Sequence, residues 1–394
     1  MEGRVPARIA FVSTYPPQRC GIATFTRDLA RGSGAHEVVA LQHAGEILRH
    51  LPEVHHRVRR DVVSDYARTA KTLNNCDVDV VSIQHEYGIW GSDDGVRLLD
   101  FIDALDLPSV ATLHTVLRQP TERQRRILST LVRSTSTTVV MSNAAAERLA
   151  ESYDIGDSHV VIVPHGVPDL EYIQPHTAKL PVGLAGHRVL LSFGLLGSGK
   201  GYELAIEAMP AIVEAAPDVR YVVLGATHPD LLAHEGEAYR NRLKARAVEL
   251  GVADHVRFVD RFVNVAELGK WLQAADLFIT PYPNLEQIVS GTLTYAMAAG
   301  RTVVSTPYTY AVELLGDGRG VIVPPASPNA LAAEVISLLG DPIRRMAIGR
   351  NAWEHTRPMI WPRVGATYAT LFERAARGPF LMAPSVQEYE RVSV

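Results

Sequence analysis

The 394-residue chain has little cysteine, no strong excess of charge and no long apolar run. Its two cysteines, Cys20 and Cys76, are too few for a disulfide framework or a structural zinc site. A formal net charge of −4 argues against nucleic acid as a main partner. No run approaches the ~20 apolar residues of a membrane span, and the first apolar run, residues 9–12, has four. We therefore expect a cytoplasmic protein.

The composition that remains is that of a globular protein. Apolar residues make up 47% of the chain and charged residues 21%. A chain of this length exceeds one usual hydrophobic core, so it predicts two domains.

Short apolar runs alternate with helical patterns along the whole chain. The first half has predicted strands at residues 9–13, 37–41, 78–84, 109–113, 138–141 and 160–163. The second half repeats the scheme at residues 189–193, 221–224, 256–258, 277–280, 302–305 and 321–323. Strands and helices that alternate at this spacing form parallel sheets, so the fold class is α/β with two Rossmann-like, doubly wound domains.

A stretch rich in Pro and Gly, residues 164–186, separates the two halves. We place the first domain at residues 1–175, a linker at 176–187, the second domain at 188–358 and a C-terminal segment at 359–394. Ligands of doubly wound sheets bind at the carboxyl ends of the strands. We therefore expect the two domains to face a central cleft that holds the ligand.

The most informative segment of the chain is residues 281–306. A strand ends in a Pro-punctuated loop that carries Glu286, and the turn Ser290-Gly291-Thr292 then opens a helix. The N-terminus of a helix offers free N–H groups to a phosphate, and a carboxylate accepts hydrogen bonds from sugar hydroxyls. The segment favours a sugar nucleotide as ligand, although an ordinary strand-loop-helix-strand unit has the same pattern.

A glycine-rich turn, residues 192–201, follows the first strand of the second half. Its glycines, Gly194 among them, can present N–H groups to phosphate, and Lys200 adds a positive charge. The turn matches most of a P-loop, but Gly201 stands where that motif needs Ser or Thr for magnesium. We predict phosphate binding of another kind. The alternative is a tight turn with an exposed lysine.

In the first half, candidate ligand residues lie after three strands. Arg19 and Gly21 lie in the loop after the first strand, and His85 and His114 end two others. Because these ends meet at one edge of a parallel sheet, they favour a polar pocket for hydroxyl-rich ligands. The histidines have no metal-ligand spacing, and Asp77-Val-Asp79 lies at the start of a strand, so we predict no metal.

The segment 122–133 predicts an amphipathic helix with basic residues on its polar face. A solvated surface helix has this pattern. Peripheral contact with anionic lipid at the inner face of the membrane is the alternative.

Taken together, these motifs resemble a retaining glycosyltransferase of family 4, with the two-domain architecture called GT-B. The resemblance covers nearly the whole chain. The residues that carry it are the Cys20-Gly21 loop, His114, Phe193-Gly194…Lys200-Gly201 and Pro281…Glu286…Ser290-Gly291-Thr292…Ala296-Met297-Ala298-Ala299-Gly300.

The resemblance implies transfer of a hexosyl group from a nucleotide diphosphate sugar to an acceptor hydroxyl, with an α-glycoside as product. It implies that Lys200 and the N–H groups near Ser290 stabilise the leaving diphosphate, that Glu286 binds donor hydroxyls and that His114 contacts the sugar. No cofactor is required, and the last helix is implied to cross back to the first domain.

The chain departs from the family pattern at two positions. Leu195 replaces an arginine that clamps the diphosphate, and Tyr295 replaces a glutamate that binds the ribose. Glu286 lies nine residues before Tyr295, one more than the family spacing. Arg19, our first choice, or Arg261 could supply the missing positive charge. A sugar phosphorylase, a nucleotide-sugar epimerase and a non-catalytic nucleotide-sugar binder remain alternatives.

Overall fold

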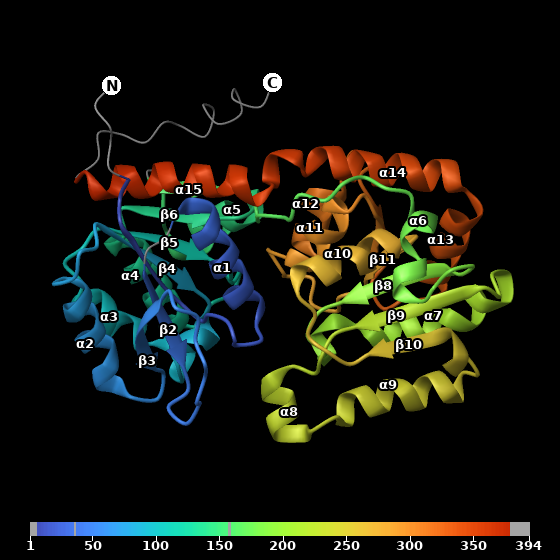
Figure 1. Ribbon diagram of the computed structural model, residues 1–394, viewed down its shortest axis with the longest axis horizontal. Helices are drawn as coiled ribbons and strands as arrows, with labels where there is room; N and C mark the ends of the chain where they lie inside the picture. Colours follow the sequence, from blue (N-terminus) through green and yellow to red (C-terminus); the bar gives the residue numbers. More distant parts are fainter. Residues whose placement is uncertain (1–5, 35–36, 157–158, 379–394) are drawn as a thin grey trace. The chain divides into compact units, whose positions relative to one another are not determined.

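The computed structural model describes residues 6–34, 37–156 and 159–378, and these form two units (Figure 1). Of the described residues, those up to 166 and those from 358 to 378 belong to the first unit, and residues 167–357 belong to the second. Both units have a parallel sheet with helices packed on it.

In the first unit the strands are β1 (Ile9–Ser13), β2 (Glu37–Gln42), β3 (Val54–Arg59), β4 (Val80–His85), β5 (Ser109–Leu113), β6 (Thr137–Val140) and β7 (Val160–Ile162). They pair in the order β3-β2-β1-β4-β5-β6-β7, and every pair is parallel. The helices are α1 (Gly21–Ser33), α2 (Val63–Leu73), α3 (Leu98–Asp103), α4 (Glu122–Ser134), α5 (Asn143–Tyr153) and α15 (Trp361–Ala376).

In the second unit the strands are β8 (Arg188–Phe193), β9 (Val219–Leu224), β10 (Val256–Val259), β11 (Leu277–Thr280), β12 (Thr302–Ser305) and β13 (Val321–Ile322). Their order, β10-β9-β8-β11-β12-β13, repeats the order of the first sheet, again with parallel pairs. The helices are α6 (Pro175–Ala178), α7 (Tyr202–Ala215), α8 (Pro229–Glu235), α9 (Ala238–Glu249), α10 (Val265–Ala274), α11 (Gly291–Ala298), α12 (Thr309–Leu315), α13 (Pro328–Gly340) and α14 (Pro342–His355).

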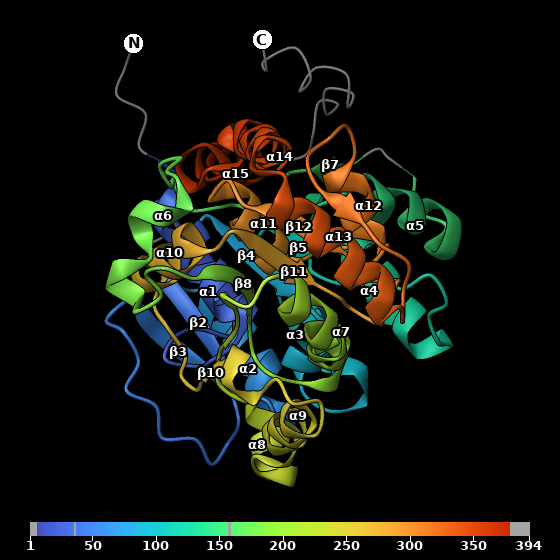
Figure 2. The same cartoon turned by 90° about the vertical axis from the view of Figure 1, so that its right-hand side faces the viewer.

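The central strands are buried along their whole length because helices cover both faces of each sheet. Strands β1, β4 and β5 have no exposed residue, and β11 and β12 are equally buried. Such strands need continuous apolar runs, which is why the sequence predicts them well. Helices α7 and α13 pack together over the core of the second unit (Figure 2).

The strand order locates the ligand edge of each sheet. In both sheets the second and third strands are added on one side of the first strand, and the later strands are added on its other side. The strand order therefore reverses between β1 and β4 in the first unit and between β8 and β11 in the second. Ligands of doubly wound sheets bind at the carboxyl ends of the strands at such a reversal. A ligand is therefore expected at the loops after β1, β4, β8 and β11.

The division of the chain differs from the predicted boundaries. Residues 167–187, which include the predicted linker, belong to the second unit. Buried contacts hold them there: Lys179 pairs with Asp276 at 2.6 Å, and Arg301 donates to the carbonyl of Ile173 at 2.7 Å. Helix α15 belongs to the first unit and lies along α1, far from it in sequence (Figure 1).

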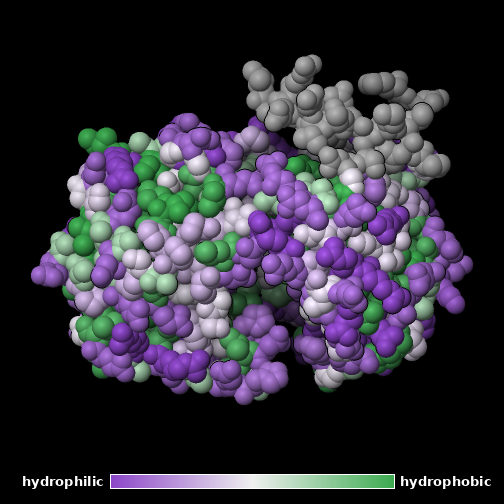
Figure 3. Space-filling view, turned by 180° about the vertical axis from the view of Figure 1, so that it is seen from behind, coloured by the Kyte–Doolittle hydropathy of each residue, from purple (hydrophilic) through white to green (hydrophobic). Residues whose placement is uncertain are grey.

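On the face seen in Figure 3, hydrophilic residues dominate and hydrophobic residues gather in small patches. Among the described residues, no helix combines the length and the apolar character that crossing a membrane would need.

Candidate functional site

The turn after β8 has a backbone that only glycine accommodates. Gly194 and Gly201 have φ angles of +138° and +65°, in the region that disfavours other residues. A Cβ atom on Gly201 would lie 2.0 Å from the carbonyl oxygen of Pro281, so the turn also touches the loop after β11. The two loops at the reversal point of the second sheet are thus in backbone contact.

The side chain of Lys200 lies against this second loop. Its Nζ is 3.3 Å from the hydroxyl of Tyr282 and 4.4 Å from the centre of that ring. The same hydroxyl is 2.7 Å from Oγ1 of Thr292, which is 3.1 Å from Oγ of Ser290. One tyrosine therefore connects the lysine to the first turn of α11.

Helix α11 begins as its sequence predicts. Ser290 is its N-cap, and the Ser290 hydroxyl accepts a hydrogen bond from the N–H of Leu293 at 3.4 Å. Thr292 also faces the glycine-rich turn, since its Cγ2 lies 3.6 Å from where a Cβ on Gly194 would stand. The structure thus brings Gly194, Lys200 and the Ser290–Thr292 turn together, as the prediction of a phosphate site requires.

A pocket of about 380 Å³ opens beside Lys200. It is lined by Leu195, Gly197, Ser198, Gly199, Lys200, His228, Leu231, Asn284 and Gln287. The lining combines one ammonium group with amide and imidazole groups that can donate and accept hydrogen bonds. Such a surface suits an anionic group that is attached to a polyol.

Glu286, the predicted sugar ligand, is exposed and does not line this pocket. Its neighbour Gln287 does, and its amide donates to the carbonyl of Val289 at 2.8 Å. Gln287 lies eight positions before Tyr295, which is the family spacing of seven intervening residues. That spacing could have identified Gln287 from the sequence. Asn284, His228 and Tyr282 have no comparable signal.

Two other predicted residues of the second unit lie outside the pocket lining. Tyr295 is almost buried, with its ring 6.4 Å from that of Phe193. Arg261 forms a two-pronged ion pair with Glu267, at 2.8 Å for one prong. That pairing lowers the pKa of Glu267 below its usual range. Arg261 would have to give up this partner before it could bind a phosphate.

In the first unit, the loop after β1 leads into α1. Cys20 is the N-cap, with its Sγ accepting from the N–H of Ala23 at 3.2 Å. Gly21 is the first residue of the helix and is exposed, and a Cβ there would meet nothing within 4 Å. Arg19 is also exposed, and its side chain makes no hydrogen bond or ion pair with any residue that the structure describes.

His114 lies after β5 among aromatic groups. Its Nε2 is 2.9 Å from Oε1 of Gln84, and its ring meets that of Phe25 edge-on at 4.8 Å. His165 contacts the same phenylalanine at 5.1 Å. Burial, followed by the nearby His165 and His85, lowers the pKa of His114 to about 3. A neutral His114 can exchange hydrogen bonds with a sugar hydroxyl without adding charge.

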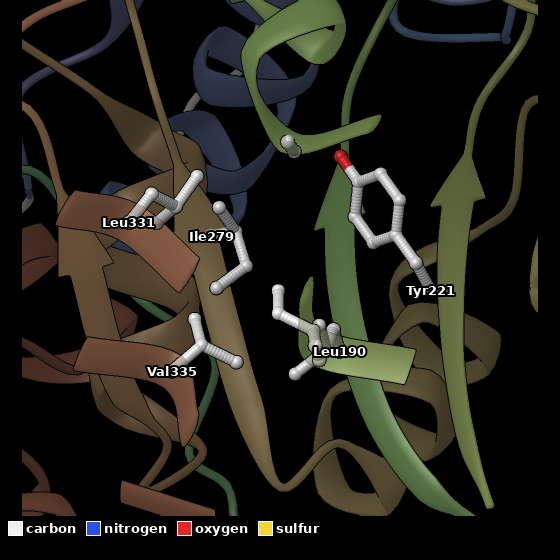
Figure 4. Close-up of a pocket in the computed structure, with 7 residues that line it drawn as sticks. Leu190, Tyr221, Ile279, Leu331 and Val335 are labelled. Atoms are coloured by element: carbon white, nitrogen blue, oxygen red, sulfur yellow. The ribbon is translucent and has the colours of Figure 1, made fainter. Parts of the chain in front are cut away.

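Two other features do not form part of the site. A gap among Leu190, Tyr221, Ile279, Leu331 and Val335 lies inside the core of the second unit, and it has no room for a water molecule (Figure 4). The carboxylates of Asp77 and Asp79 both form ion pairs with Arg8, so an arginine, and not a metal ion, balances their charge.

Helix α4, the amphipathic segment, packs on the first unit through Ile127, Leu128, Leu131 and Val132. One of its basic residues, Arg123, donates to Asp94 at 2.8 Å. The remaining arginines of its polar face, Arg125, Arg126 and Arg133, are exposed. Contact of this helix with a membrane stays a prediction.

Comparison with known proteins identifies the family. Residues 20–169 match the model described as glycosyltransferase family 4, and residues 183–355 match that of glycosyl transferases group 1. Together the two matches span most of the chain. The chain belongs to the family-4-type glycosyltransferases.

Relatives of known name agree with this class. A D-inositol 3-phosphate glycosyltransferase of Segniliparus rotundus is 28% identical over 292 residues, which are 70% of this chain and 63% of that protein. The lipopolysaccharide core mannosyltransferase LpsB of Rhizobium meliloti is 28% identical over 54% of this chain and 59% of its own length.

Solved structures show the same fold. HepE of Anabaena, crystallised with UDP and glucose, aligns with a TM-score of 0.75 at 17% identity, over 93% of this chain and 99% of that one. The glycosyltransferase WaaG aligns with a TM-score of 0.68 at 18% identity, over 92% and 99% of the two chains. The predicted GT-B fold of two Rossmann-like domains is confirmed.

Proposed function

We propose that this protein is a retaining glycosyltransferase that moves a hexosyl group from a nucleotide diphosphate sugar to an acceptor hydroxyl. The observation that carries the proposal is the position of Lys200. Its ammonium group lies on Tyr282, next to the first turn of α11 and beside a pocket of about 380 Å³. A cation and free N–H groups at one place suit a leaving diphosphate.

In the proposed reaction, the bond between the anomeric carbon and the diphosphate oxygen breaks while the acceptor oxygen bonds to the same face of that carbon. The acceptor proton passes to the leaving diphosphate. The protein contributes position and positive charge rather than a covalent intermediate. Lys200 and the N–H groups of residues 290–292 stabilise the charge that develops on the diphosphate. The proposal requires no metal and no further cofactor.

Donor hydroxyls are bound by neutral groups in this proposal. The positions that hold the family's two glutamates carry Gln287 and Tyr295, if the seven-residue spacing is kept. Gln287 and Asn284 line the pocket, and an amide offers both a donor and an acceptor to a hydroxyl pair. HepE has been crystallised with UDP and with UDP-glucose, which supports testing uridine donors first.

The test is turnover with a panel of UDP-, GDP- and ADP-sugars and polyol or polyol-phosphate acceptors. Inositol phosphate is the first acceptor to try, because relatives are named for it. We expect release of the nucleotide diphosphate and, by NMR, a product with the α configuration of the donor. A β-linked product would refute the retaining mechanism.

A non-catalytic nucleotide-sugar binder is the second candidate. The observation that favours it is the absence of a carboxylate at positions 287 and 295. Saturable calorimetric binding of a nucleotide sugar, with no transfer and no hydrolysis across the panel, would establish this alternative instead.

A further inference from the structure

Three side chains of different chemistry meet at the other edge of the first sheet, away from the loops described above. Glu37 is the first residue of β2, His56 lies within β3, and Cys76 lies in the connection from α2 to β4. One donor atom from each of them, an oxygen, a nitrogen and a sulfur, lies within 4.8 Å of both others. We infer that Glu37, His56 and Cys76 form a binding site for a zinc-like divalent cation.

The distances fit such an ion. Nε2 of His56 is 3.5 Å from Oε2 of Glu37 and 3.9 Å from Sγ of Cys76. Tetrahedral zinc, with bonds of about 2.0–2.3 Å, separates its ligands by about 3.3–3.8 Å. These two separations are thus within a few tenths of an ångström of the tetrahedral values, and the third, between Glu37 and Cys76, is at most 4.8 Å. The set of sulfur, nitrogen and oxygen ligands is the one that zinc takes up.

The carboxylate of Glu37 gives a separate reason. Its Oε2 atom is buried, and among the described residues no group donates a hydrogen bond to it. A buried carboxylate oxygen without a donor is unfavourable, because it has lost its hydration. A cation between this oxygen, the imidazole and the thiol would compensate that loss.

The backbone at His56 is also irregular. Val38 of β2 pairs with Val54, but the next residue, Val39, pairs with His56, so His55 is an extra residue in β3. Bulges are rare in parallel pairs and often redirect a side chain at a functional position. Here His55 is exposed, while His56 is partly buried on the same side of β3 as Val58.

The site would hold the edge strand β3 to its neighbours. Its three ligands come from β2, β3 and the segment before β4, and three protein ligands leave a fourth position for water. All three lie near the amino ends of β2 and β4, whereas the glycosyl transfer proposed above needs the carboxyl ends. The ion is therefore expected to stabilise the first unit without taking part in transfer. A structural site of this kind uses one cysteine with a histidine and a glutamate, which is why the cysteine count alone did not predict it.

The experiment uses the full-length protein after removal of metals with a chelator. Calorimetry with zinc should show one ion per chain, and zinc should raise the melting temperature, since it binds only the folded arrangement. Glu37→Gln, His56→Gln and Cys76→Ala should each weaken zinc binding by at least about 100-fold, the upper end of outer-shell effects.

His55→Gln is the matched control, because it removes the neighbouring histidine, which faces solvent. It should bind zinc as the wild type does. Cobalt gives a second measurement: a thiolate-to-cobalt absorption band should appear in the wild type and in His55→Gln and be absent from Cys76→Ala. Glu37→Gln is nearly isosteric, so it remains informative if Cys76→Ala fails to fold.

Lack of zinc uptake by the wild type would overturn the proposal. So would equal affinity in His56→Gln and His55→Gln, or a cobalt band that survives Cys76→Ala.

Discussion

At the scale of single residues, the position of Lys200 allows a direct test of the proposed leaving-group stabilisation. Its ammonium group is held by the ring and hydroxyl of Tyr282. Loss of one such contact to developing charge costs about 2.7–4 kcal/mol in the transition state. Lys200→Ala should therefore lower kcat by roughly 100- to 1000-fold in steady-state assays with a nucleotide sugar.

The control for this variant is Lys270→Ala. Lys270 is an exposed lysine of α10, so its removal changes the net charge equally without altering the pocket. Its kinetics should match the wild type. Unchanged kcat in Lys200→Ala would remove this residue from the reaction.

Tyr282 should act through the residues that it holds. Tyr282→Phe keeps the ring under the ammonium group of Lys200 but deletes the hydroxyl between Lys200 and Thr292. One hydrogen bond contributes about 0.5–1.5 kcal/mol, so kcat/KM should fall roughly two- to tenfold. Tyr282→Ala also removes the ring and should cost more. Equal kinetics for the two variants would show that the ring has no part in placing Lys200.

Glu286 and Gln287 are adjacent, and the structure places only Gln287 in the pocket lining. We expect Gln287→Ala to weaken binding of a nucleotide sugar more than binding of the free nucleotide, by about 1 kcal/mol or roughly fivefold. Glu286→Gln should change neither affinity. Titration calorimetry with both ligands measures the difference. The reverse pattern would assign the sugar to Glu286, as the residue type alone predicts.

At the scale of elements, the contact between α1 and α15 depends on two glycines. A Cβ on Gly365 would lie 2.3 Å from the backbone of Gly32, which has no side chain that could move away. Overpacking destabilises a folded protein by about 1–3 kcal/mol, and the higher helix propensity of alanine offsets up to about 1 kcal/mol of that loss. Gly365→Ala should therefore lower the free energy of unfolding by about 1–2 kcal/mol in urea titrations.

Gly21→Ala tests whether the effect is specific to the contact. Gly21 is also helical, in α1, and a Cβ there meets nothing within 4 Å. Its stability should stay within about 0.5 kcal/mol of the wild type. If Gly365→Ala is as stable as the wild type, α1 and α15 can move apart without lowering the free energy of unfolding, and the close contact does not stabilise the fold.

Elements were predictable where burial decides the residue pattern. Strands such as β1, β5 and β11 are mainly apolar, because helices cover both of their faces, and their predicted limits match the structure. Strand β3 was missed. Its sequence, Val54-His-His-Arg-Val-Arg59, is polar because it forms the edge of the sheet.

The candidate site was predictable only in part, for a related reason. Glycines, a helix cap and a lysine next to strand ends leave local patterns, so the sequence predicts Gly194, Lys200 and Ser290 as candidates, and the structure brings them together. Tyr282 gave no such pattern, because its role depends on contacts with Lys200 and Thr292, ten or more positions away. Gln287 was missed because the choice of Glu286 followed residue chemistry rather than spacing.

At the scale of the whole molecule, the two units share a strand order but differ in buried histidine. His85, His114 and His165 lie in the first unit, and burial lowers their pKa values to about 3, 3 and 4. In the second unit, burial and Arg319 lower the pKa of His355. The two units should therefore respond unequally to acid.

The direction in which stability changes with pH follows from proton binding. Below the ordinary pKa of about 6.5 the unfolded chain binds protons at these histidines, whereas the folded unit does so only near pH 3–4. Stability is thus complete above pH 7 and falls as the pH drops from 6.5 toward 4. Each histidine changes the free energy of unfolding by up to about 1.4 kcal/mol per pH unit in this range.

Tryptophan fluorescence can follow the first unit alone. Of the four tryptophans, Trp90 and Trp361 lie in the first unit, whereas Trp271 and Trp353 lie in the second. In a Trp271→Phe, Trp353→Phe protein, the urea midpoint should fall steadily between pH 7 and pH 5. Adding His85→Gln, which does not titrate in this range, should make that fall shallower by about one histidine's share. A midpoint that is constant over this range, or a slope that His85→Gln leaves unchanged, would mean that these histidines are not neutral in the folded unit.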